Sequence, residues 1–173
     1  CGSLSLTDEP ARSATFYAVQ EAKKAGAVIS YDPNYRPLLW KTEEDAIEKM
    51  RSMVPYADIM KISDEETELL SGKADPKEAA EELLKQGVSC VVVTLGKDGA
   101  LLKTKDIEVQ AKGKDRKPVD TTGAGDSFWE GLLSRLALNN VKPADLTAEQ
   151  AKEYLDFANA VAGLCVEKRG AIP

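Results

Sequence analysis

The sequence predicts an α/β fold in which helices cover both faces of a mostly parallel β-sheet. Strand-like and helix-like segments alternate along most of the chain, an order typical of parallel sheets with helical crossovers. Residues 88–94 contain Val91, Val92 and Val93 in an unbroken apolar run, which suits a strand buried on both faces. With 173 residues, the chain is long enough for one domain with a sizeable core.

In the first half of the chain, capping residues and glycines mark the expected boundaries. Four helices are expected. The first is capped by Thr7 or Asp8, has Pro10 in its first turn and ends before Gly26, and the second follows Thr42. The third is capped by Ser63 and ends near Gly72, and the fourth starts at Asp75 and Pro76 and stops at Gly87. Residues 27–31 and 58–62 are short β-rich runs between these helices, and they are expected to form strands.

In the second half, a turn over residues 96–99 follows the buried strand and leads into two extended stretches, 100–104 and 107–111. A glycine-rich loop at 123–125 opens a helix, and Thr147 caps the last helix, which runs towards Val166. The segment that begins at Cys1 resembles the end of a strand that feeds a loop. We therefore expect the chain to be part of a longer protein.

The composition excludes several classes of function. The chain contains no histidine, which removes Ser-His and Cys-His nucleophile pairs and the usual zinc sites. No apolar run approaches the ~18 residues of a membrane span. The net charge of −6, with lysines and glutamates interspersed, disfavours nucleic-acid and anionic-membrane partners. Cys1, Cys90 and Cys165 form no CxxC pair, so we expect reduced, buried thiols in a cytoplasmic protein.

The strongest chemical signal is the stretch 120–128, DTTGAGDSF. Its two glycines allow close approach of the backbone to a ligand, and the helix that follows directs unpaired N–H groups and a positive dipole end at it, which suits a phosphate. A carboxylate at this place, Asp126, would repel a phosphate, but it is well placed to orient and deprotonate an attacking hydroxyl during phosphoryl transfer. The alternative interpretation is a helix capped after a glycine-rich turn.

This stretch resembles the C-terminal signature of the ribokinase-like (PfkB) carbohydrate kinases, and the resemblance extends from Gly2 to Ala171. It implies a three-layer α/β/α sandwich, with 1–173 as the C-terminal nucleotide-binding and catalytic part of one kinase domain. Several strands, most sugar contacts and a β-sheet lid would then lie in an N-terminal part outside this sequence. The resemblance also implies that Gly123, Ala124 and Gly125 form the anion hole and that Asp126 is the catalytic base.

Two further segments resemble the nucleotide site of this family. Residues 94–99 (TLGKDG) resemble its ATP loop, which implies nucleotide contacts from Thr94, Gly96, Lys97 and Gly99, with Lys97 near the phosphates. From the residues alone, a tight turn explains these glycines as well. Asn159 matches a position that lines the adenine pocket, and ordinary helix packing is the alternative.

Two candidate cation sites follow from the same resemblance. Ser63 and Glu66 form a capping box, which is a sufficient structural explanation. The family has Asn-x-x-Glu here, so Glu66 is implied to place Mg²⁺ through water, and Ser63, which departs from the asparagine, is a candidate nucleotide contact. Family members often hold K⁺ beside the anion hole, which implies a site at the following four residues: Asp120, Thr122, Cys165 and Gly170.

Residues 32–40 (DPNYRPLLW) resemble fructokinases most closely, and also 2-keto-3-deoxygluconate kinases. Asn34 and Arg36 are therefore candidate nucleotide or substrate contacts, although DPN also suits a plain turn and Arg36 a surface charge. A guanidinium group at the ligand edge of a sheet is able to bind a phosphate or an acid group.

Taken together, these features predict ATP-dependent transfer of a phosphoryl group to a sugar hydroxyl with Mg²⁺, most closely fructose to fructose 6-phosphate. The alternatives are a 2-keto-3-deoxygluconate kinase, in which Arg36 would meet the substrate carboxylate, and a nucleotide-binding relative that has lost activity. The expected partners are the sugar, ATP and a second copy of the chain, which would dimerise through the N-terminal lid.

Overall fold

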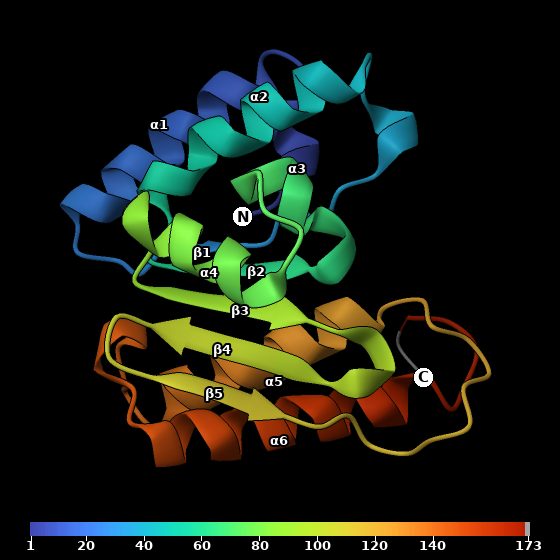
Figure 1. Cartoon of the computed structure of the whole chain (residues 1–173). Helices are drawn as coiled ribbons and strands as arrows, with labels where there is room; N and C mark the ends of the chain where they lie inside the picture. The colour runs from blue at the N-terminus through green and yellow to red at the C-terminus, as the bar shows by residue number, and fades with distance from the viewer. Residues whose placement is uncertain (172–173) are drawn as a thin grey trace. The chain divides into compact units, whose positions relative to one another are not determined.

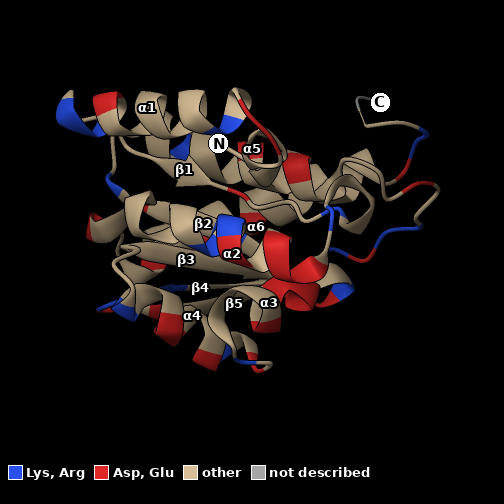
Figure 2. Cartoon of the chain, turned by 90° about the horizontal axis from the view of Figure 1, so that it is seen from above, with Lys and Arg blue, Asp and Glu red and all other residues tan. Residues whose placement is uncertain are grey.

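The computed structural model describes residues 1–171, which divide after Val93 into two compact units. Each unit combines β-strands with α-helices (Figure 1). Basic and acidic residues are interspersed along the helices (Figure 2), in agreement with the mixed charge pattern of the sequence. No helix within residues 1–171 combines the length and apolar character that a bilayer span requires.

The first unit alternates helices and strands in the predicted order. Its elements are α1 (Ala11–Lys24), β1 (Ser30–Tyr31), α2 (Glu43–Met53), β2 (Ile59–Ser63), α3 (Thr67–Ser71), α4 (Pro76–Lys85) and β3 (Cys90–Thr94). The strands β1 and β2 pair in parallel, with Ser30 opposite Ile59. Two predicted helix starts are confirmed, and the side chains of Thr42 and Asp75 cap α2 and α4 by accepting hydrogen bonds from first-turn N–H groups.

Two boundaries of the first unit differ from the prediction. Helix α1 begins after Pro10 without a side-chain cap, since the Thr7 hydroxyl donates to the Leu4 carbonyl instead. Strand β1 is shorter than the predicted 27–31. The N–H of Ile29 donates to the carboxylate of Asp58 at 2.7 Å, so a side chain takes the bond that a strand ladder would use.

The second unit is an antiparallel hairpin packed with two long helices. Strands β4 (Ala100–Thr104) and β5 (Glu108–Ala111) pair antiparallel, because the connection between them is too short for a helical crossover. Helix α5 (Ala124–Leu138) packs along α6 (Ala148–Cys165), which also contacts β5 (Figure 1). A Cβ atom on Gly131 would lie 3.2 Å from the Cα of Ala158, so this glycine allows the close approach of the two helices.

The cysteines are unpaired thiols, as predicted, but only two of them are buried. Cys90 and Cys165 lie in the interior, and burial raises the pKa of the Cys90 thiol to about 12. The prediction is wrong for Cys1, which is exposed.

Candidate active site

The loop before α5 is shaped around one left-handed glycine. Gly123 precedes the helix with a φ of 80°, and a Cβ atom there would lie 2.7 Å from the Cβ of Ala171. A residue other than glycine would therefore meet both backbone strain and a steric clash. Gly125 lies inside the first turn of α5. The sharp turn of the motif thus depends on Gly123.

Asp126 lies in the first turn of α5 and is exposed to solvent. The N–H of Ser127 donates to the Gly123 carbonyl at 2.8 Å, and the N–H of Ala124 donates to the Thr121 carbonyl at 3.2 Å. The N–H groups of Gly125 and Asp126 are the ones that the helix start leaves without an acceptor inside the helix. This end of α5 therefore offers amides to an anion and a carboxylate to a neighbouring hydroxyl.

Asp120 closes the same loop with both of its carboxylate oxygens. One oxygen accepts the N–H of Gly170 at 3.0 Å, and the other accepts the N–H of Thr122 at 2.9 Å. These bonds, that of Gly170 first, hold the pKa of Asp120 at about 2. The Sγ of Cys165 donates to the Thr122 carbonyl at 3.6 Å. The structure thus brings together the four residues predicted to hold K⁺, and their binding of a cation stays a prediction.

A cavity of about 310 Å³ lies in the second unit. Four predicted site residues line it: Gly96, Lys97, Ala124 and Asn159. Thr94 and Gly99 lie outside this lining, whereas Lys114 and Arg116 are lining residues that the sequence-based prediction missed. The signal for them was the basic run at 112–117 (KGKDRK), directly before the glycine-rich motif.

Two backbone contacts fix the wall of this cavity. A Cβ atom on Gly99, whose φ is 97°, would lie 2.0 Å from the Ala111 carbonyl oxygen, and one on Gly113 would lie 2.2 Å from that of Lys97. The amide of Asn159, only 6% exposed, donates to the carbonyls of Ala111 (3.4 Å) and Lys112 (3.2 Å). Asn159 therefore lines the cavity and also fastens α6 to the end of β5.

In the first unit, a buried ion pair holds the loop that carries Asn34 and Arg36. The Nζ of Lys61 lies 2.5 Å from one oxygen of Asp32, and the two residues are only 5% and 8% exposed. The other oxygen of Asp32 accepts the N–H of Asn34, whose φ is 49°. Lys61 was not predicted: it lies between apolar residues of the expected strand 58–62, but the sequence alone does not name its partner.

Glu66 fastens the same loop from a second direction. One carboxylate oxygen accepts the N–H of Tyr35 at 2.6 Å, and the other accepts the N–H (2.8 Å) and the hydroxyl (3.0 Å) of Ser63. Glu66 is only 6% exposed. The predicted capping box is therefore present. The role of Glu66 toward Mg²⁺ and that of Ser63 toward a nucleotide stay predictions.

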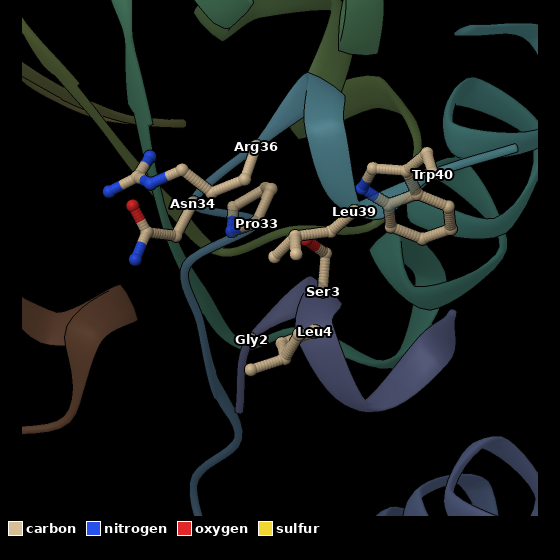
Figure 3. A pocket seen from close by; sticks show the side chains of 8 residues that line it. All are labelled: Gly2, Ser3, Leu4, Pro33, Asn34, Arg36, Leu39 and Trp40. Carbon is tan, nitrogen blue, oxygen red and sulfur yellow. The ribbon is translucent and has the colours of Figure 1, made fainter. Parts of the chain in front are cut away.

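Arg36 is exposed, and its guanidinium donates to the carbonyl of Tyr35 at 3.0 Å. Together with Asn34, Leu39 and Trp40 it lines a hollow of about 250 Å³. Figure 3 shows the polar ends of Asn34 and Arg36 pointing to the same side, away from the Trp40 ring. Their binding of a nucleotide or a substrate stays a prediction.

The comparisons with known proteins identify the family. Residues 1–173 match the sequence model of the pfkB family carbohydrate kinases. The chain belongs to this family. It is 41% identical over 179 residues to "Probable fructokinase-7" of Arabidopsis thaliana, covering 99% of this chain and 50% of that relative. It thus spans about half the length of the curated relatives it matches.

Comparison with solved structures confirms the predicted ribokinase-like α/β fold. The chain matches a double mutant of the fructokinase of Vibrio cholerae O395, crystallised with fructose, ADP and potassium ion, with a TM-score of 0.90 and 33% identity. That match covers 99% of this chain and 54% of the other. The aminoimidazole riboside kinase of Salmonella enterica, complexed with aminoimidazole riboside and an ATP analogue, matches with a TM-score of 0.85, 32% identity and coverage of 100% and 58%.

Proposed function

We propose that the protein carrying this chain is an ATP-dependent fructokinase that forms fructose 6-phosphate. The observation that carries the proposal is the solvent-exposed Asp126 in the first turn of α5, directly after the left-handed Gly123. The cavity lined by Lys97 and Ala124 supplies room for a nucleotide in the same unit. The likeness to fructokinases in both sequence and structure supports fructose as the acceptor.

In the proposed reaction, Asp126 accepts the proton of the sugar hydroxyl as that oxygen forms its bond to the γ-phosphorus. The bond between the γ-phosphorus and the bridging oxygen breaks, and ADP leaves with the electron pair. The first-turn amides of Gly125 and Asp126 stabilise the charge on the transferring group. Lys97 adds a cation at the cavity, as proposed from its ATP-loop position.

Two cations fit the residues of this chain. Mg²⁺ would reduce the charge of the nucleotide phosphates. Glu66 would reach it through water, since a carboxylate that accepts three hydrogen bonds still has room for a further donor. K⁺ would take oxygens at the cluster of Asp120, Thr122, Cys165 and Gly170, where the fructokinase of Vibrio cholerae supplies a precedent for bound potassium ion in the family. Homodimerisation through an N-terminal lid belongs to the same proposal.

The decisive experiment is a comparison of kcat/KM for three acceptors with purified full-length protein: fructose, 2-keto-3-deoxygluconate and aminoimidazole riboside. We expect fructose to be preferred at least tenfold. A tenfold preference for either of the other two acceptors would assign the enzyme to that substrate instead. Absence of ATP turnover with all three would favour a nucleotide-binding relative without activity.

The role of Asp126 is tested separately. We expect Asp126→Asn to lower kcat by ~10³-fold or more while ATP still binds, because the anion-hole donors are backbone groups. Retention of more than about a tenth of wild-type kcat would remove Asp126 as the base.

A further inference from the structure

The segment 112–118, named the strap here, connects β5 to the glycine-rich motif and supplies part of the cavity lining, including Lys114 and Arg116. Helix α6 fastens it at both ends. At the start, the amide of Asn159 donates to the Lys112 carbonyl, and just past its end the N–H of Val119 donates to the Val166 carbonyl at 2.7 Å. In Figure 1 this stretch lies beside the C-terminal segment that follows α6. The strap therefore covers one face of α6 from Asn159 to Val166.

Between these ends, two ion pairs hold the strap. The Nζ of Lys114 lies 3.5 Å from the carboxylate of Asp156, and the guanidinium of Arg116 lies 3.1 Å from that of Glu167. All four side chains of these pairs are about 40% exposed, so both ion pairs are weak and sensitive to salt. Contacts of this kind hold a segment in place without preventing its movement.

Gly163 of α6 lies directly beneath the strap. A Cβ atom on Gly163 would lie 3.2 Å from the Cγ of Arg116 and 3.5 Å from the Cβ of Lys114. A branched side chain at this position would displace the strap. The close fit of Arg116 over Gly163 therefore sets the width of the cavity at this wall.

We propose that Arg116, held across Gly163 by Glu167, forms the movable outer wall of the nucleotide cavity, and that Glu167 is a positioning residue for nucleotide affinity. This inference rests on the proposed nucleotide site but not on the identity of the sugar. The ion pair between Arg116 and Glu167 keeps the strap closed over the bound nucleotide. When the pair opens, the strap moves away and the nucleotide dissociates. Salt should therefore weaken nucleotide binding through this pair.

The test is the Kd for ADP, measured by calorimetry with full-length protein in the absence of sugar. We expect Glu167→Gln to raise Kd about threefold at low salt, and this difference from wild type should vanish at ~0.5 M salt because screening removes the pair. The matched control is Glu153→Gln, the same charge change at an exposed position inside α6, which should leave Kd unchanged. Equal Kd values for the two variants would overturn the proposal.

A charge exchange separates positioning from direct contact with the nucleotide. Glu167→Arg alone should raise Kd about tenfold by repelling Arg116, and adding Arg116→Glu should restore Kd to within about twofold of wild type. Failure of the double variant to recover would overturn the proposal, because the cation at 116 would then act on the nucleotide itself.

A third variant tests the contact at Gly163 independently of charge. Gly163→Val should raise Kd at least tenfold while Tm changes little, since valine in a helix costs no more than glycine. An unchanged Kd would show that the strap does not bound the site. ADP binding by a protein that fails to phosphorylate fructose would refute the proposed substrate and leave the strap testable.

Discussion

Replacement of Lys61 by methionine should destabilise the protein far more than loss of a surface lysine. The side chains of Lys61 and Asp32 are only 6% and 11% exposed, so removal of Lys61 takes the ammonium group away from an almost fully buried carboxylate. Breaking a buried pair in this way costs about 3–5 kcal/mol. Asp32 keeps its bond from the N–H of Asn34, which places the expected loss near the lower end, at about 3 kcal/mol.

The assay is urea unfolding of the full-length protein, with the free energy of unfolding taken from the midpoint and slope. Lys24→Met serves as control, because Lys24 forms an exposed pair with Glu21 and should lose less than about 0.5 kcal/mol. The double variant Lys61→Met/Asp32→Asn also removes the buried negative charge and should recover at least about 1 kcal/mol of that loss. A loss below about 1 kcal/mol for Lys61→Met would refute the argument, since the pair would then behave as a surface pair.

Three further perturbations test the site. Gly123→Ala should lower Tm more than Gly26→Ala, because both positions have positive φ but only the first would bring a Cβ within 2.7 Å of Ala171; equal losses would show that the contact is unimportant. The pKa of Asp120 is held at about 2 by hydrogen bonds, below its unfolded value near 4, so its stabilisation is complete above about pH 4 and is lost as the pH falls toward 2. Asp120→Asn should therefore flatten the dependence of Tm on pH between about 4 and 2, and an unchanged slope would contradict this assignment. Arg36→Ala should raise KM for ATP or lower kcat and leave the ratio of fructose to 2-keto-3-deoxygluconate turnover unchanged; a loss of roughly 30-fold or more confined to the acid would instead place Arg36 on a substrate carboxylate.

Local chemistry explains which parts of the fold the sequence predicts well. The helix starts at Thr42, Asp75 and Thr147 are confirmed, because a capping side chain bonds within its own first turn and needs no distant partner. The short β1 was not predictable, since it depends on a bond from Ile29 to the carboxylate of Asp58, 29 residues away.

The same limit applies to the candidate site. The turn at Gly123 and the position of Asp126 in the first turn of α5 follow from the motif itself. Lys61 and Arg116 were missed because their partners lie 29 and 51 residues away along the chain. A charge acquires such a role only through tertiary contacts, and a sequence pattern around the charge does not encode them.

The two carboxylates of the glycine-rich motif are separated in function by their hydrogen bonds. Asp120 accepts backbone N–H groups on both oxygens and has a lowered pKa, so it is a fixed acceptor that ties the loop to Gly170. Asp126 is exposed and has no hydrogen-bond partner among residues 1–171, so its carboxylate is available to an incoming hydroxyl. Asp120→Asn should therefore lower stability at neutral pH, whereas Asp126→Asn should lower kcat with Tm unchanged. The opposite result would exchange these two assignments: Asp126→Asn would then lower Tm without affecting kcat, and Asp120→Asn would lower kcat without affecting Tm.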